Sequence, residues 1–269
     1  MPVRREAQFM VVTSASGQDV TMASLGISRQ RRVWTKRAEE WDHGSVPGLD
    51  RVIEQVLGLA KPEGVALAVD LGCGTGALTL PLARMAKQVV AVDVSQAMID
   101  LLRRHAQESG LTNIDARTGA IEELDLAPGS VDVVVTNYAL HHLRDRDKQV
   151  VVERAARWLR PGGRLVIGDM MFGRGGDARD WAIAAGKVKA LVRKGPGGVW
   201  RVVKNLWRYT WRVQERPVSM SAWQSMLRKA GFEAVEAVGV LAEAGVVGGR
   251  LPATGAAPAA GPAGSATDR

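Results

Sequence analysis

VALAVDLGCGTG, at residues 65–76, is the stretch of this sequence that decides its fold. Its first seven residues are apolar except for Asp70, which is the pattern of a strand buried on both faces of a parallel sheet. The glycines that follow allow a tight turn in which the backbone can approach a ligand closely. Residues 77–86 continue with a helical pattern. The stretch therefore predicts a strand, a ligand-binding turn and a helix, which open an α/β domain.

Strand-like and helix-like segments alternate along the rest of the chain, which indicates a parallel sheet with helices on both faces. Further strands are expected at residues 88–92, 113–117, 131–136, 164–170, 233–240 and 245–251. Helices are expected at residues 96–107, from about 148 to a turn at 161–163, and at 220–230, with Ser95 as an N-cap. The pattern predicts seven strands in all.

The two ends of the chain lack this periodicity. Residues 1–28 are polar and rich in Ser and Gly, and we expect a flexible leader there. Residues 252–269 are mostly Ala, Gly and Pro, and we expect a disordered tail. Residues 29–251 are then one domain. Because no apolar run is long enough to span a membrane and no signal-peptide pattern occurs, we expect a cytoplasmic location.

The net charge of +8 comes from one segment. Residues 181–216 hold nine of the 36 Lys and Arg residues but one of the 28 acidic residues, so the two signs balance elsewhere. Trp200, Trp207 and Trp211 repeat at helical spacing beside a row of basic residues. Four interpretations stay open for such a helix: a cover over an apolar small molecule, an interfacial helix on anionic lipid, a contact with RNA, or a merely solvated charged face.

A second sign of a bound ligand lies at the end of the next strand. Asp93 follows the glycine turn by about twenty residues, where a carboxylate can accept hydrogen bonds from both hydroxyls of a ribose. Gly72, Gly74 and Ala77 also satisfy the G-x-G-x-x-A pattern of dinucleotide-binding proteins. These features alone therefore do not decide whether the ligand is a dinucleotide. Cys73, the only cysteine, lies inside the turn and is expected to be a small filler. No metal site is expected.

The full string from Val69 to Gly76 resembles the first motif of the class I S-adenosylmethionine-dependent methyltransferases. Later segments are similar to the same family in the same order, at residues 89–93, 119–124, 130–134, 137–143 and 159–165. The resemblance covers about residues 34 to 251 and is greatest to the small-molecule branch that includes the ubiquinone and menaquinone C-methyltransferases. It implies a Rossmann-like α/β fold with a seven-stranded, mostly parallel sheet and an antiparallel last strand, and S-adenosyl-L-methionine as cofactor.

Asp70 separates this family from the dinucleotide-binding proteins, because a carboxylate beside the turn would repel a pyrophosphate but favours the cationic groups of adenosylmethionine. Many relatives have Asp at the position of Ala120, where it accepts from the adenine amino group. Here the backbone of Ala120 and Ile121, or Glu122, is expected to take over. The expected cofactor-binding residues are Asp70, Gly72, Cys73, Gly74, Gly76, Asp93, Val94, Ala120, Ile121 and Asn137.

The resemblance puts the reacting atom of the acceptor beside residues 137–143. His141 and His142 point to different faces if a helix starts there, so at most one is expected to reach the methyl group. A histidine could act there as a general base, and the alternatives are local packing and transfer by positioning alone. Tyr138 is a further catalytic candidate. The expected acceptor-pocket residues are Trp34, Trp41, Asp169, Trp200 and Trp207.

These features predict a methyltransferase for a small, lipophilic acceptor of the quinone, polyketide or lipid kind, with release of S-adenosylhomocysteine. The insertion at residues 172–217 is expected to cover the acceptor, as in small-molecule relatives. The alternatives are an RNA methyltransferase and a domain that binds the cofactor without turnover. Residues 137–140 lack the prolines of the Asn-Pro-Pro-Tyr signature, which disfavours nucleic acid as a partner. Peripheral membrane contact through residues 181–216 and the oligomeric state stay open.

Overall fold

The structure, a computed structural model, describes residues 27–28, 30–36, 38, 47–172 and 216–253. Its strands are β1 (Ala68–Leu71), β2 (Val89–Asp93), β3 (Ile114–Thr118), β4 (Val131–Asn137), β5 (Leu159–Met170), β6 (Glu233–Gly239) and β7 (Ala244–Arg250). Its helices are α2 (Leu49–Ala60), α3 (Thr79–Met85), α4 (Gln96–Glu108), α5 (Asp145–Trp158) and α8 (Met220–Lys229), with a 3-10 helix η1 (Leu140–His142). Residues 27–28, 30–36 and 38 are also helical, so this helix includes the end of the expected leader. α2 was not predicted from the sequence.

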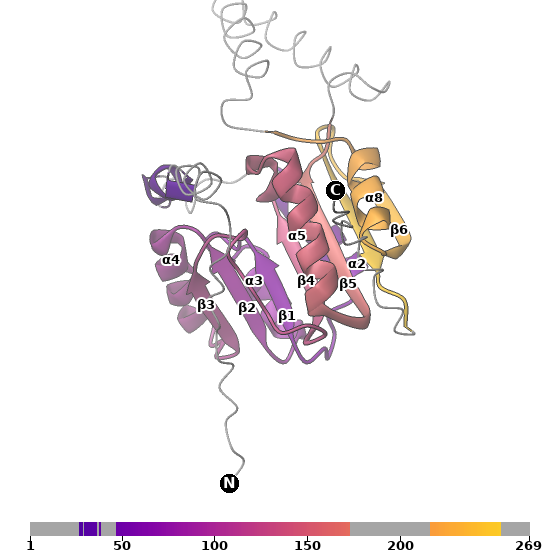
Figure 1. Cartoon of the computed structure of the whole chain (residues 1–269). Helices are drawn as coiled ribbons and strands as arrows, with labels where there is room; N and C mark the ends of the chain where they lie inside the picture. Colours follow the sequence, from indigo (N-terminus) through magenta and orange to yellow (C-terminus); the bar gives the residue numbers. More distant parts are fainter. Residues whose placement is uncertain (1–26, 29, 37, 39–46, 173–215, 254–269) are drawn as a thin grey trace, which may run out of the picture.

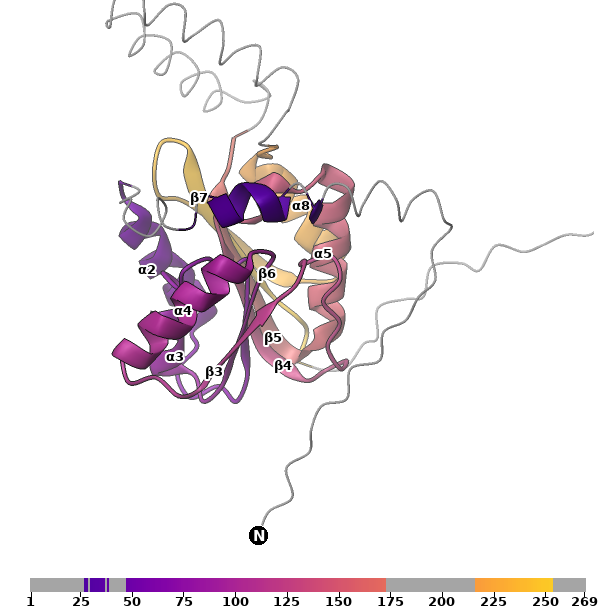
Figure 2. The ribbon, with the colours of Figure 1, turned by 90° about the vertical axis from the view of Figure 1, so that its left-hand side faces the viewer.

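The strands form one seven-stranded sheet in the order β3-β2-β1-β4-β5-β7-β6 (Figure 1). β7 is antiparallel to both of its neighbours, whereas the other adjacent strands are parallel. Helices cover both faces of the sheet (Figures 1 and 2). The predicted Rossmann-like α/β fold and its antiparallel last strand are confirmed.

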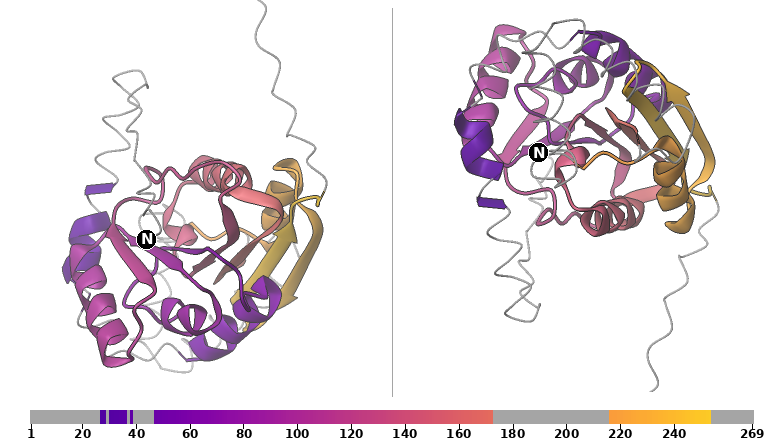
Figure 3. Two further views of the ribbon diagram at one scale, coloured as in Figure 1. Left: turned by 90° about the horizontal axis from the view of Figure 1, so that it is seen from below. Right: turned by 90° about the horizontal axis from the view of Figure 1, so that it is seen from above.

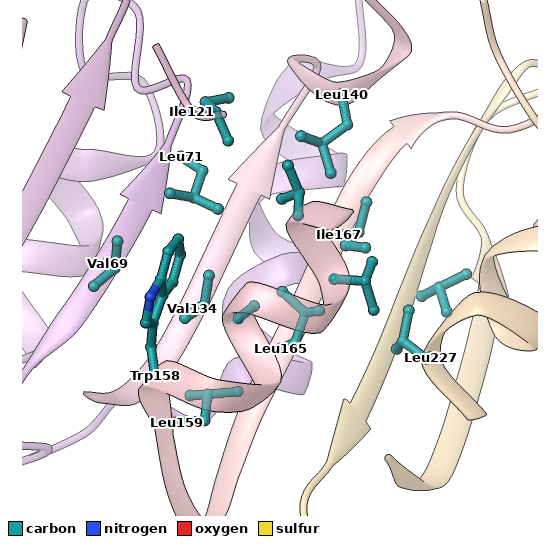
Figure 4. Packing of buried hydrophobic residues seen from close by; sticks show 14 of the residues in the cluster. Val69, Leu71, Ile121, Val134, Leu140, Trp158, Leu159, Leu165, Ile167 and Leu227 are labelled. Atoms are coloured by element: carbon teal, nitrogen blue, oxygen red, sulfur yellow. The ribbon is translucent and has the colours of Figure 1, made fainter. Parts of the chain in front are cut away.

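Burial follows the position of a strand in the sheet. β1 and β4, in the middle, are almost entirely buried, whereas β3 and β6 at the edges are half-buried or exposed apart from Ala116. Alternate residues of β1 face opposite layers: Val69 and Leu71 pack in the same cluster as Trp158 of α5 and Leu227 of α8 (Figure 4), whereas Ala68 packs with residues of α2 and α3. Both faces are therefore apolar, which explains the continuous apolar runs in the sequence.

The start of β5 differs from the prediction. A turn was expected at residues 161–163, but β5 begins at Leu159, directly after α5. Leu159 pairs with Val131, the register then shifts, and pairing resumes with Arg164 opposite Val133. Because Pro161 has no N–H to donate to a neighbouring strand, a bulge rather than a regular ladder fits this position.

β1 is the strand at which the order of the sheet reverses. The chain passes from β1 outward to β2 and β3, and then returns to β4 on the other side of β1. Such a switch point is where open α/β sheets bind their ligands, at the carboxyl ends of the strands. Figure 3 (right) looks down on this edge of the sheet.

A matched pair of glycine substitutions tests the packing of the layers. An added Cβ on Gly168 of β5 would lie 2.6 Å from Val56 Cγ2 of α2 and 2.9 Å from Asn137 Oδ1. We expect Gly168→Ala to lower the free energy of unfolding by about 1–3 kcal/mol through overpacking. Gly58 on α2 has nothing within 4 Å of an added Cβ, so Gly58→Ala should raise it by about 0.5–1 kcal/mol. Urea denaturation measures both, and equal stability of Gly168→Ala and the unmodified protein would contradict the packing.

Candidate active site

The turn after β1 is built from glycines in the left-handed region of backbone space. Gly72, Gly74 and Gly76 have φ angles of 74°, 53° and 103°, which residues with a side chain adopt only at a cost. The N–H groups of Gly72 and Cys73 donate to the carbonyl of Val92 at 2.8 and 3.0 Å. These bonds attach the turn to the end of β2.

Asp70 is buried beside this turn, with 1% of its surface exposed. Its Oδ2 accepts a hydrogen bond from the Thr79 hydroxyl at 2.6 Å, whereas its Oδ1 is buried without a partner among the described residues. Burial, together with the nearby charge of Asp93, raises the pKa of Asp70 to about 7, against the opposing effect of the Thr79 hydrogen bond. A buried acceptor without a donor is costly, so this oxygen favours a ligand that donates a hydrogen bond or carries a positive charge.

Asp93 is the last residue of β2, and its carboxylate accepts hydrogen bonds from two backbone N–H groups. Its Oδ2 accepts from Gly74 at 3.1 Å and its Oδ1 accepts from Ser95 at 2.9 Å. Burial raises its pKa, and the backbone hydrogen bonds oppose that rise. Because each carboxylate oxygen can accept more than one hydrogen bond, Asp93 can still accept from the hydroxyls of a ligand.

These groups open into a cavity at the carboxyl ends of β1, β2 and β4. Its empty space amounts to about 880 Å³ when the open solvent at its mouth is included. The predicted cofactor-binding residues that line it are Asp70, Gly72, Cys73, Gly74, Asp93, Val94, Ala120, Ile121 and Asn137. The predicted acceptor-side residues that line it are Trp34, Tyr138 and His142.

Several lining residues were not predicted: Gln30, Leu49, Thr75, Ala77, Leu78, Met98, Ala139 and Leu143. Thr75, Ala77 and Leu78 lie within or directly after the glycine turn, so their place in the sequence could have predicted that they line the cavity. Gln30 and Leu49 lie before β1 in the chain and reach the cavity only through the packing of their helices, for which the sequence has no motif. Glu122, named from the sequence as an alternative contact, also lines the cavity.

Three residues expected in the site do not line this cavity. Gly76 faces α4, because an added Cβ would lie 2.5 Å from Leu102 Cδ1. His141 and Asp169 are buried and bonded to each other, so they are not placed to contact a ligand here directly. Trp41, Trp200, Trp207 and the remainder of residues 173–215 lie outside the described part of the chain.

Trp34 and His142 meet at one side of the cavity. Their ring centroids are 5.1 Å apart in an edge-to-face arrangement. The helix that carries Trp34 is attached to α4, where Ala38 packs with Met98 and Leu101. Trp34 therefore connects the side of the cavity next to Asp93 with the side that carries His142.

Tyr138 follows β4 in a strained backbone conformation, with a φ angle of 51°. Its N–H donates to the carbonyl of Gly168 at 2.9 Å. Burial, then the charges of Asp169 and Glu243, raise the pKa of Tyr138 to about 12. The strain is typical of functional positions, but the raised pKa keeps the phenol protonated at neutral pH.

His141 and Asp169 form a buried pair behind His142. Asp169 Oδ1 lies 2.5 Å from His141 Nδ1, and Asp169 Oδ2 accepts from the backbone N–H of His141 at 2.9 Å. The rings of His141 and His142 lie against each other with centroids 3.9 Å apart. The two bonds from Asp169 at the end of β5 thus fix η1, and with it the position of His142.

Cys73 has no features of a nucleophile, in agreement with its expected role as a filler. The side chain is buried, and burial raises the pKa of its thiol well above the ordinary value. Among the described residues, no group of three or more His, Cys, Asp or Glu is placed to hold a metal ion. No described helix is long and apolar enough to cross a membrane.

Comparisons with known proteins agree with this geometry. A family model described as a methyltransferase domain matches residues 68–163. A ubiquinone biosynthesis O-methyltransferase of Xanthomonas euvesicatoria pv. vesicatoria (strain 85-10) is 28% identical over 179 residues, 66% of this chain and 67% of that protein. The uncharacterized protein YafE of Escherichia coli (strain K12) is 31% identical over 163 residues, 58% of this chain and 77% of that protein. The chain belongs to the S-adenosylmethionine-dependent methyltransferases.

A solved structure has the same fold as this methyltransferase. The DhpI–SAH complex is 20% identical in sequence and superposes with a TM-score of 0.61, covering 84% of this chain and 97% of that one. The family predicted from the sequence, and S-adenosyl-L-methionine as its cofactor, are confirmed.

The residues of the methyltransferase cavity fit this cofactor. Asp70 Oδ1, which has no hydrogen-bond partner within the described part of the chain, is a suitable acceptor for its cationic amino group. Asp93 would hold the ribose hydroxyls, and the glycine turn between them lets the backbone come close to the ligand. Ala120 lines the same cavity, as does Ile121.

The raised pKa of Asp70 makes the affinity for a cationic ligand depend on pH. Above pH 7 the carboxylate is already ionised, so affinity should be level. Below pH 7 binding must release the proton from Asp70, so the affinity for S-adenosylhomocysteine should fall by up to about tenfold per pH unit. Asp70→Asn should bind more weakly at high pH and lose this dependence. Calorimetry across the pH range measures both, and a flat profile for the unmodified protein would contradict the role of Asp70.

Proposed function

We propose that this methyltransferase acts on a small, lipophilic acceptor and that His142 removes the proton of the attacking group. The observation that carries the proposal is the position of His142: it lines the cavity between the Trp34 indole and the buried pair of His141 and Asp169. Histidine is suited to proton transfer near neutral pH.

The apolar character of the cavity beside His142 supports a lipophilic acceptor. The Trp34 indole contacts His142, and Leu49, Tyr138, Ala139 and Leu143 also line the cavity. Apolar walls with few polar groups are usual in sites for small organic ligands. A quinone-like, polyketide-like or lipid molecule fits this chemistry better than a polar one.

The insertion at residues 172–217 belongs to the same proposal, as a cover over the acceptor. Its first residue, Phe172, follows β5, at the same end of the sheet as the cavity. At its other end the N–H of Arg216 donates to the carbonyl of His141 at 2.6 Å. The chain thus leaves and returns beside the residues that support His142. The cytoplasmic location expected from the sequence is also part of the proposal.

The chain contributes binding, orientation and a proton acceptor to the reaction. When bound, S-adenosylmethionine supplies a methyl group that its positive sulfur already activates. Asp70 and Asp93 would hold the two polar parts of the cofactor, and Trp34 would help to exclude water. His142 would accept the proton of a hydroxyl or enol as the acceptor attacks. His141 and Asp169 act through the backbone of η1 and are positioning residues.

The direct test of this function is a screen with labelled S-adenosylmethionine against an extract of the source organism. Label should appear in the lipid-soluble fraction with the unmodified protein and be absent with Asp93→Ala, in which the acceptor for the ribose hydroxyls is removed. Label in RNA would overturn the proposed acceptor class. Absence of transfer together with intact cofactor binding would instead favour a domain without turnover.

Substitutions at the cavity distinguish the role of His142 from that of Tyr138. His142→Gln should lower the rate constant of methyl transfer by about 10²–10⁴-fold, the usual contribution of a general base, and should leave the affinity for S-adenosylhomocysteine unchanged. Tyr138→Phe is the control, because a phenol with a pKa of about 12 is not a base at neutral pH, and it should keep most of the activity. Single-turnover kinetics with the acceptor found in the screen measures both. A fully active His142→Gln enzyme would exclude the base.

A further inference from the structure

The loop after β3 lines the cavity but has no helix or strand to hold its shape. Ala120, Ile121 and Glu122 all contribute to the cavity wall. Within the loop, the N–H groups of Glu123 and Leu124 both donate to the carbonyl of Ala120, at 3.0 and 3.2 Å. Neither of these bonds involves the carbonyls of Glu122 and Leu124, which are left to accept from donors outside the loop.

Arg154 of α5 supplies that donor. Its Nη1 donates to the carbonyl of Glu122 at 2.5 Å and to the carbonyl of Leu124 at 3.1 Å. The side chain is half-buried and forms no ion pair within the described part of the chain. Its charge is therefore directed at the loop backbone, and hydrogen bonds from a charged donor are stronger than those between neutral groups.

The helix that carries Arg154 is a rigid support. Val151, Ala155 and Trp158 of α5 are fully or almost fully buried in the core that covers the sheet. Figure 4 shows Trp158 beside Val69 and Val134, and Ile121 near Leu71. A guanidinium fixed on this helix can hold the loop in one conformation, because its own position is set by the core.

We propose that Arg154 is a positioning residue for the adenine end of S-adenosylmethionine. Ala120 has no side-chain acceptor for an amino group, so recognition at this wall of the cavity falls to the loop backbone or to Glu122. Both depend on the path of the loop from residue 120 to residue 124. Arg154 binds the backbone at both Glu122 and Leu124 and so sets that path.

The chain offers a matched control on the same helix. Arg157 lies three residues further along α5 and contacts the loop only at its far end, through Asp125 Oδ1 at 3.5 Å, with both side chains more than half exposed. Such an exposed pair contributes little. Substitution of Arg157 therefore removes the same charge from the same helix without removing a donor from the loop carbonyls.

The test is calorimetric binding of S-adenosylhomocysteine and of S-inosylhomocysteine, in which an oxygen replaces the adenine amino group. Arg154→Met keeps an apolar stem and removes the donor. It should weaken S-adenosylhomocysteine by about tenfold and S-inosylhomocysteine much less, so that the preference for adenine falls. Arg157→Met should bind both ligands like the unmodified protein.

Two results would overturn the proposal. One is a folded Arg154→Met protein with unchanged affinity for S-adenosylhomocysteine. The other is an equal loss for the two ligands, which is the outcome of a merely structural role. If Arg154→Met does not fold, Arg154→Lys replaces it with Arg157→Lys as control: a shorter stem should weaken the adenine ligand selectively, and equal affinity in both lysine variants would overturn the proposal.

Discussion

The hydrogen bonds from the Gly72 and Cys73 N–H groups to the Val92 carbonyl are the contacts on which the rest of the site depends. They continue the pairing of β1 and β2 beyond the last residue of β1, and so bring the glycine turn onto the end of β2. Only in this position can Asp93 accept from Gly74 at the tip of the turn. A side chain at Gly72 would prevent this, because its Cβ would lie 2.3 Å from Ala139 Cβ.

The same close approach places the buried carboxylate of Asp70 and the half-buried carboxylate of Asp93 at one cavity. Asp70 and Asp93 each have a raised pKa, and the charge of Asp93 contributes to the rise at Asp70. Two neighbouring acids destabilise each other, and a positive charge bound at Asp70 offsets this repulsion. The unfavourable charge of the protein without ligand is thus relieved on binding of a cation, and that relief favours S-adenosylmethionine over a pyrophosphate.

Two further walls of the cavity, η1 and the loop after β3, are short or irregular segments. In each, a polar side chain from a neighbouring element fixes the backbone through hydrogen bonds. Asp169 fixes η1 through His141, and Arg154 fixes the loop after β3 through two carbonyls. In the first case β5 carries the supporting residue and in the second case α5 does. Regular elements next to the cavity therefore supply the rigidity that the loops lack, which is the arrangement that precise positioning of reactants requires.

The sequence by itself determined the α/β fold, the glycine turn, Asp70 and Asp93, and the family of the protein, because these features are local: a buried strand, its turn and its last residue are neighbours in the chain. It also identified His142 and Trp34 as candidates. Only the tertiary structure decided that His142 lines the cavity while His141 is buried with Asp169. It also decided that Arg154 donates to the backbone of the loop after β3. These contacts join residues about thirty positions apart, and their geometry depends on how helices pack on the sheet, which no short motif encodes.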